Sequence, residues 1–266
     1  MIHSTAVVHP RAIVPPSTLV GPYAVIDEHV RLGENCVIGP HVYLTGRTTI
    51  GDRNRFYAGA VIGEAPQDLK YRDEPTRLRI GNDNSFRENT TVHRANTEQA
   101  DTVVGSNNLL MAGAHVGHNA VLGDHTLLAN GALVAGHVFI DDRGFVSGNC
   151  VVHQFVRIGR MAMMQGGSAI SKDLPPFCVA RGSNGLCGLN SVGLRRAGYS
   201  HEQRLELRRL YHLLFRNRKE LLRTAAESAR QEFTSEASRL LLDFVASTKR
   251  GLCSDRARTP GTSEEE

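Results

Sequence analysis

The feature that most constrains this chain is an apolar residue at every sixth position along two long stretches. The pattern runs from Val8 to Ile62 and from Val104 to Ile170 without a miss. A period of six fits neither an α-helix nor a flat strand, and it is typical of a parallel β-helix in which one hexapeptide forms one side of a triangular coil. Three hexapeptides close a coil, so residues eighteen apart stack on strands ~4.8 Å apart. The sequence therefore predicts a mainly β fold.

Polar residues gather on one edge of this predicted coil. Steps of eighteen from His118 reach Gly136 and then Gln154, and His137 and His153 lie beside them. We therefore expect these side chains to lie on three successive coils and to form a site.

Two interruptions break the repeat. The first, EAPQDLKYRDEPTRLR after Gly63, brings Gln67, Asp68 and Lys70 close together. Insertions in repeat proteins loop out on one face and often carry binding residues, so we expect this one to contribute to a site. The second, RANTEQAD before Val104, is expected to be a tolerated surface loop.

The repeats stop at the sequence DLPP (173–176), since consecutive prolines cannot join a ladder of hydrogen bonds. A glycine-rich connector follows, and from Ser200 the apolar period becomes helical, with a capping box to Gln203. We predict a β-helix over residues 1–183, a connector with a small α-helical domain over 184–253, and a disordered tail over 254–266.

Composition limits the compartment and the partners. The chain has 266 residues, of which 41% are hydrophobic, and a net charge of +4. No stretch approaches the ~20 apolar residues of a membrane span and the N-terminus lacks a signal-peptide pattern, so we expect a cytoplasmic protein with no integral membrane segment. Five cysteines without CxxC spacing argue against a disulfide framework. The late basic residues lack aromatic interleaving, so they do not predict nucleic-acid binding.

His118 is the first candidate for chemistry. An imidazole can take a proton from a hydroxyl or water at neutral pH, and the N–H of Gly136, one coil above, could stabilise an oxyanion. His115 is expected to point to another side of the coil. Two other interpretations stay open. His118 could be a surface histidine without a role, or three histidines could hold a zinc ion with an open position.

Several short motifs resemble one family. They are QDLKY (67–71), EPTR (74–77), NLLM (108–111), AHVGH (114–118), AGHV (135–138), VHQF (152–155) and DLPP (173–176). Over about Val7 to Leu252, the chain resembles the UDP-N-acetylglucosamine O-acyltransferases of lipid A biosynthesis. The resemblance implies a left-handed parallel β-helix, a homotrimer with active sites between subunits, no cofactor, and no metal. It also implies transfer of a β-hydroxyacyl group from acyl carrier protein to the 3-hydroxyl of UDP-N-acetylglucosamine, the first step of lipid A biosynthesis.

The resemblance also implies roles for individual residues. His118 would be the general base and Gly136 the oxyanion donor. The substrate would be held by Gln67, Asp68, Lys70, His115, His137, His153, Gln154, Asn190 and Arg196. Gly166 and Met163 would limit the length of the acyl chain, and a small residue at Gly166 favours a long one. Independently of the resemblance, Arg216, Arg218 and Lys219 crowd one short helical stretch, and we therefore expect them to contribute to docking the carrier protein.

Three positions depart from the family pattern. Asn119 follows the catalytic histidine where familiar members have Asp, so it can orient the imidazole but not stabilise its charge as a carboxylate would. Val192 and Ala197 stand where the family often has Glu and a second Arg, which implies fewer nucleotide contacts.

Three other functions compete with this one. An N-acyltransferase of the same pathway carries an extra N-terminal domain, whereas the repeats here begin at the first residues. A zinc-dependent hydratase of the γ-carbonic anhydrase type uses the same coil and trimer. A purely structural repeat protein would lose no activity on substitution of His118.

Overall fold

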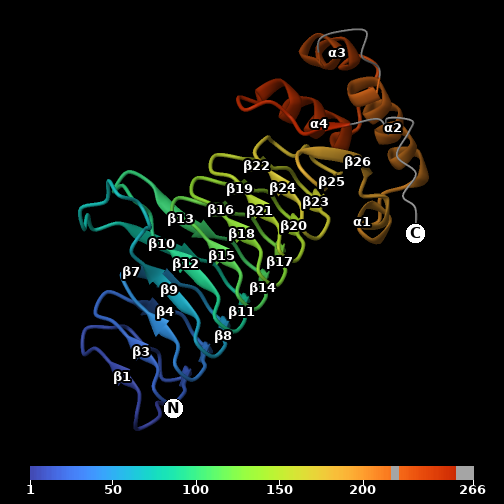
Figure 1. Cartoon of the computed structure of the whole chain (residues 1–266). Coiled ribbons are helices and arrows are strands. Elements are labelled where there is room, and N and C mark those ends of the chain that lie inside the picture. The colour runs from blue at the N-terminus through green and yellow to red at the C-terminus, as the bar shows by residue number, and fades with distance from the viewer. Residues whose placement is uncertain (217–221, 256–266) are drawn as a thin grey trace, which may run out of the picture.

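The computed structural model of the chain describes residues 1–216 and 222–255. It is a stack of triangular coils that rises from the N-terminus to a group of helices at the far end (Figure 1). Two loops project from the same side of the stack beside β10 (Arg77–Ile80) and β13 (Asp101–Val104). None of the described helices is long and apolar enough to cross a bilayer.

Each side of the prism is one sheet, in which all pairs between coils are parallel. The first sheet contains β1 (Val7–Val8), β3 (Val25–Ile26), β6 (Tyr43–Leu44), β9 (Val61–Glu64), β12 (Thr91–His93), β15 (His115–Val116), β18 (Leu133–Val134), β21 (Val151–Val152) and β24 (Ala169–Ile170). The second contains β4 (Arg31–Leu32), β7 (Arg47–Ile50), β10, β13, β16 (Val121–Leu122), β19 (Phe139–Ile140) and β22 (Arg157–Ile158). The third contains β2 (Leu19–Val20), β5 (Val37–Ile38), β8 (Arg55–Phe56), β11 (Ser85–Phe86), β14 (Leu109–Leu110), β17 (Leu127–Leu128), β20 (Phe145–Val146), β23 (Met163–Met164), β25 (Cys178–Arg181), β26 (Gly185–Leu189) and β27 (Ser254–Asp255).

The six-residue period creates this stack because the second residue of each short strand points inward. In β15, Val116 is fully buried, whereas His115 lies on the outer surface. The inward residues stack on one another from coil to coil, as the rings of Phe56 and Phe86 do at 4.8 Å. Because each inward residue must meet the one above, the apolar period also fixes the register.

The step between coils lengthens where the sequence has insertions. His115 pairs with Leu133, a step of eighteen residues. Val61 pairs with Thr91 and Thr91 with His115, which are steps of 30 and 24 residues. The extra residues leave the stack as loops, so the coils above and below keep their alignment.

The C-terminal part closes the top of the stack. Its helices are α1 (Ser191–Arg196), α2 (His201–Tyr211), a π-helical segment η1 (His212–Arg216), α3 (Leu222–Ala229) and α4 (Glu236–Ser247). Ser200 caps α2, and it forms the predicted capping box with Gln203.

The third sheet continues past the predicted end of the β-helix. Antiparallel β26 pairs with β25, and β27 then pairs with β26. Ser254 and Asp255, the first residues of the predicted tail, therefore belong to a sheet, and residues 256–266 lie outside the described part of the chain. These strands cover the ladder end that the last coil would otherwise expose.

Candidate active site

A cleft of about 840 Å³ lies along the edge where β15, β18 and β21 end. Its lining includes six residues that the sequence singled out: Gln67, His115, His118, Gly136, His153 and Gln154. The coil arithmetic brought His118, Gly136 and Gln154 to one edge correctly. His115 differs from the expectation, because it lines the same cleft as His118 instead of another side. His115 is the outward residue of the two-residue strand β15, and His118 lies at the corner three positions later. Both face the cleft.

His118 lies half-buried at the corner after β15. Its Nδ1 is 2.8 Å from Oδ1 of Asn119, so this nitrogen is engaged with the next residue. The other ring nitrogen, Nε2, lies against Gly136: a Cβ built on that glycine would be 2.8 Å from Nε2. Asn119 therefore holds the Nδ1 edge of the imidazole, and Nε2 lies against Gly136, which has no side chain.

Gly136 contributes a backbone group as well as space. Within the described chain, no hydrogen bond uses its N–H, whereas its carbonyl oxygen accepts from Phe155. The coil below approaches just as closely, since a Cβ on Gly117 would lie 2.7 Å from this same nitrogen. Two glycines on stacked coils thus keep a backbone N–H open beside an imidazole, the arrangement that oxyanion stabilisation requires.

A second pair of histidines forms the floor of the cleft beside β12. The rings of His93 and His115 meet edge to face at 4.9 Å, and Thr91 Oγ1 lies 2.7 Å from His115 Nδ1. Burial, with the charges of His115 and His118, lowers the pKa of His93 to about 4. Burial likewise lowers the pKa of His115. At neutral pH both are therefore uncharged hydrogen-bonding groups.

His137 contacts the catalytic candidate from above. Its ring meets that of His118 edge to face at 5.1 Å and stacks on Phe155 at 4.5 Å. Asn119, His137 and Phe155 are spaced by eighteen residues and all adopt left-handed backbone, with φ of 58°, 60° and 66°. Burial and the neighbouring His118 lower the pKa of His137. This column of corner residues holds the outer side of the site.

The first insertion is fastened over the cleft by Arg94, which follows β12. The Arg94 guanidinium donates to the carbonyl oxygen of Gly63 at 2.8 Å and to the Tyr71 hydroxyl at 3.2 Å. Asp68 accepts the backbone N–H of Lys70 at 3.0 Å, and this bond and one from Asn96 lower its pKa. Asp68 therefore carries a negative charge, and Lys70 has an exposed side chain.

Seven predicted residues are not among those that line the cleft of this chain: Asp68, Lys70, His137, Met163, Gly166, Asn190 and Arg196. Asn190 caps α1 by accepting the N–H of Gly193 at 2.9 Å and donates to the carbonyl oxygen of Met161 at 3.0 Å. Arg196 is exposed at the end of α1. Gly166 is an exposed corner residue above Gly148.

An apolar strip leads upward from the histidines on the outer face of the first sheet. His115 pairs with Leu133, Leu133 with Val151, and Val151 with Ala169. Leu133 and Val151 are 44% and 46% exposed, although both are large and apolar. Exposed apolar residues in a row beside a polar site are typical of a surface that binds hydrocarbon.

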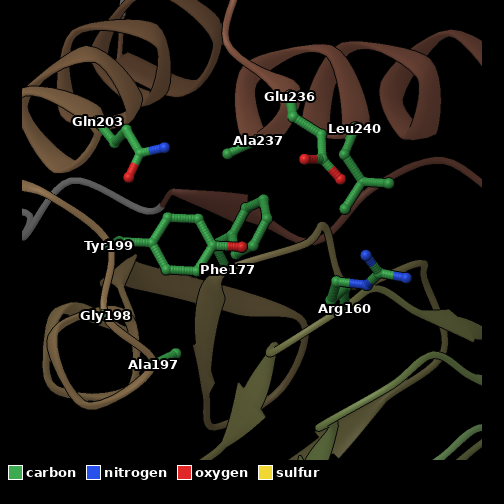
Figure 2. A pocket seen from close by; sticks show the side chains of 9 residues that line it. All are labelled: Arg160, Phe177, Ala197, Gly198, Tyr199, Gln203, Glu236, Ala237 and Leu240. Atoms are coloured by element: carbon green, nitrogen blue, oxygen red, sulfur yellow. The ribbon is translucent and has the colours of Figure 1, made fainter.

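A second cavity, of about 240 Å³, lies between the last coils and the helices (Figure 2). Phe177 and Tyr199 lie at its centre, Glu236 reaches into it from α4, and Arg160 lines it from the side of the coils. Ala197, one of the positions that departs from the family pattern, lies at its edge, and Val192 is exposed on α1. This cavity shares no lining residue with the cleft of His118.

The histidines do not assemble a metal-binding set. Among residues 1–216 and 222–255, no group of three His, Cys, Asp or Glu side chains converges as metal ligands would. His93 and His115 instead use their rings for mutual packing and for the bond to Thr91.

Sequence reasoning missed His93 and Asn96. His93 belongs to the column of Gly117 and His153, but the second insertion changes the step from eighteen to 24 residues and hides it. Counting back 24 residues from Gly117, with the insertion included, would have found it. Asn96 lies in a loop without a period, and it carried no signal.

Comparison with known proteins places these features in a family. Residues 173–253 match the family model described as UDP-N-acetylglucosamine O-acyltransferase, domain 2, and three segments (11–46, 29–64 and 101–136) match the bacterial transferase hexapeptide model. The chain is 43% identical over 253 residues to an acyl-[acyl-carrier-protein]–UDP-N-acetylglucosamine O-acyltransferase from Anaeromyxobacter sp., covering 94% of this chain and 98% of the relative. It is 45% identical over 255 residues to the one from Myxococcus xanthus, with the same coverage.

The structural match is equally extensive. The UDP-N-acetylglucosamine acyltransferase of Francisella novicida superposes with a TM-score of 0.91 at 33% identity, covering 96% of this chain and 95% of that one. The comparisons confirm the predicted left-handed parallel β-helix of hexapeptide repeats.

Proposed function

The chain belongs to the UDP-N-acetylglucosamine O-acyltransferase family, and on this premise we propose that it transfers a β-hydroxyacyl group from acyl carrier protein to the 3-hydroxyl of UDP-N-acetylglucosamine. This reaction is the first step of lipid A biosynthesis. The observation that carries the assignment to this cleft is the contact between His118 and Gly136, which puts a free imidazole nitrogen beside an open backbone N–H.

The proposed mechanism uses both groups. His118 Nε2 takes the proton of the sugar 3-hydroxyl as its oxygen attacks the thioester carbonyl carbon. The new C–O bond forms, and the oxyanion receives a hydrogen bond from the N–H of Gly136. When the C–S bond breaks, the protonated imidazole returns the proton to the departing thiolate of the carrier protein. The products are the sugar ester and the free carrier thiol, and His118 is restored.

The sugar acceptor is assigned to the polar end of the cleft. Gln67, His115, His153 and Gln154 line it, and Asp68, Lys70 and His137 border it through the first insertion and the corner column. Uncharged imidazoles suit sugar hydroxyls because each can donate one hydrogen bond and accept another. His115 fits this role, since its pKa is lowered.

The acyl chain is assigned to the apolar strip of Leu133, Val151 and Ala169. The strip begins at His115, where the thioester would lie, and runs toward the coils that carry Met163 and Gly166. Exposed Gly166 offers no side chain that would stop a long chain. Gly166 and Met163 are therefore the residues proposed to limit the length of the acyl chain.

The position of Asn190 and Arg196 supports a homotrimer. Asn190 caps α1 and Arg196 is its last residue, and both lie outside the cleft of their own chain. A neighbouring subunit that brings its α1 to this cleft would supply the guanidinium that a nucleotide diphosphate requires.

The carrier protein is assigned to the basic helices. Arg208 and Arg209 are exposed on α2, and Arg216 is exposed although it pairs with Asp255 at 2.9 Å. Arg218 and Lys219, which the sequence also predicted for docking, lie outside the described residues. The cytoplasm is the compartment in which a carrier protein and a nucleotide sugar would both reach the cleft.

The test is acyl transfer by the purified protein, with UDP-N-acetylglucosamine and a panel of β-hydroxyacyl carrier proteins, detected by mass spectrometry. His118→Ala should lower kcat by ~10²–10⁴-fold with the fold intact, because it removes the base. A wild-type protein that makes no ester from any donor, in either direction of the reaction, would refute the proposal. Stoichiometric zinc in the purified trimer would instead favour the hydratase.

A further inference from the structure

Asn96 belongs to the second insertion, yet it bonds to two parts of the candidate site. Its backbone N–H donates to Asn119 Oδ1 at 3.1 Å, and its side-chain Nδ2 donates to Asp68 Oδ2 at 2.7 Å. A single residue therefore connects the first insertion, the second insertion and the residue beside His118.

The bond to Asn119 determines which way its amide points. A backbone N–H can only donate, so the atom that it meets must be the amide oxygen. The same oxygen lies 2.8 Å from His118 Nδ1, so Nδ1 must carry the hydrogen and Nε2 the lone pair. The reverse orientation would set the Asn119 NH₂ against another donor.

This orientation leaves the nitrogen of the Asn119 amide without a partner. Asn119 Nδ2 is buried and has no hydrogen-bond partner among the described residues. The backbone N–H of Asn119 is held as well, by Thr102 Oγ1 at 2.7 Å. An unsatisfied buried donor is unfavourable, so its retention points to a function for the amide oxygen.

Asn119 carries no charge, so a charge that favours protonated His118 must come from elsewhere. Asp68 is close enough for the charges of Asp68 and His118 to interact. The other titratable groups that face His118 are His93, His115 and His137, all with lowered pKa values, and Arg94 and Lys70 are cations on the adjoining segments. Asp68 supplies the negative charge in this set.

We propose that Asn96 is a positioning residue for acyl transfer: it fixes the Asn119 amide against His118 and holds the Asp68 carboxylate near the imidazole. In this chain two residues then divide a task that a carboxylate directly after the histidine would perform alone, with Asn119 orienting the ring and Asp68 offsetting its charge. The inference rests on the proposed function.

The test compares the pH dependence of kcat/KM in the trimeric wild type, Asn96→Ala, Asn119→Asp and the double variant. Asn96→Ala should lower kcat on the order of tenfold and move the acid limb to lower pH, because the Asp68 charge is no longer held beside the base. Asn119→Asp should move the acid limb to higher pH, because it puts a carboxylate beside the ring.

The double variant tests whether the two residues share one task. In the Asn119→Asp background, Asn96→Ala should lower kcat less than about threefold, since the new carboxylate performs both tasks. Thr97→Ala, an exposed neighbour in the same loop, is the control and should keep the wild-type profile.

A loop with a merely structural role gives different results. Asn96→Ala would then match Thr97→Ala, or would lose activity equally in both backgrounds with no movement of the acid limb, and either result overturns the inference. NMR titration of isotope-labelled His118 in the same proteins gives a readout without turnover. An inactive wild type would refute the proposed function. Asn96→Ala keeps the backbone N–H that Asn119 accepts and removes only the bond to Asp68, so an unchanged titration of His118 in this variant would refute the role of the Asn96 side chain.

Discussion

Gly136 lies directly against the imidazole of His118: a Cβ on the glycine would be 2.8 Å from both Cε1 and Nε2 of the ring. Real Cβ atoms do not approach so closely, so any side chain at this position would force the ring to turn. The glycine thus has two tasks, since it makes room for the base and presents an open N–H beside it.

Gly136→Ala should therefore lower kcat by about 10²-fold while KM for UDP-N-acetylglucosamine changes little, because the displaced ring and N–H act on the transition state. Steady-state kinetics and thermal unfolding of the purified variant measure this. Gly148→Ala is the matched control, because its Cβ would lie 3.4 Å from the nearest atom, Asn130 O, on an equivalent corner. Equal kcat values for the two variants would contradict the assignment of Gly136.

His93 should make the folded protein sensitive to acid. Its pKa is about 4 in the folded chain, so between about pH 6.5 and pH 4 the histidine is protonated in the unfolded chain but not in the folded one. The free energy of unfolding is unaffected above pH ~6.5 and should fall as the pH drops toward 4, by about 2 kcal/mol per subunit at pH 5.

His93→Gln should remove most of that loss. Urea denaturation at pH 7.5 and pH 5 measures the difference, with exposed His201→Gln as the control. A wild-type protein that loses no more stability than His93→Gln between these pH values would show that His93 is not held neutral.

Gly166 should set the length of the acyl donor. Gly166→Leu should shift the preference toward shorter β-hydroxyacyl chains, and Gly166→Ala should shift it less, because the larger side chain blocks more of the groove. A Cβ at this position would meet only Gly148 O, at 3.6 Å, so the fold should tolerate both changes. Competition among donors of different length, followed by mass spectrometry, measures the shift, and an unaltered product distribution in Gly166→Leu would remove Gly166 from this role.

Charge reversal of Arg216, Arg218 and Lys219 together should raise KM for the acyl carrier protein about tenfold and leave KM for UDP-N-acetylglucosamine nearly unchanged. The effect should shrink with added salt, since the attraction between exposed charges is screened. Arg55→Glu, on β8 of the third sheet, is the control, because its exposed side chain makes no hydrogen bond or ion pair within the described chain. Equal KM values for the carrier protein in the two variants would place docking elsewhere.

The part of the site that could be predicted from the sequence lies where the step of eighteen is unbroken. His118, Gly136 and Gln154 share a column because no insertion falls between β15 and β21. The apolar period that forms the core also fixes their register, so core and site follow from one pattern.

The remaining residues depend on structure that has no period. His93 was hidden by a six-residue insertion, and Asn96 by a loop that only its hydrogen bonds to Asn119 and Asp68 distinguish from a neutral one. The direction of His115 could not be read from spacing, because a two-residue strand and its corner open on the same groove.

Because the coils are evenly spaced, the groups that bind a substrate lie at fixed steps along the stack. Groups borne by successive coils, such as Gly136 and Gln154, are separated by the spacing of parallel strands, ~4.8 Å, which backbone hydrogen bonds keep constant. A substitution can change the side chain that a coil presents, but the spacing between coils stays the same. Selectivity in such a scaffold therefore evolves by substitution of side chains at fixed positions on the coils. A longer or shorter substrate must be bound by residues of the next coil.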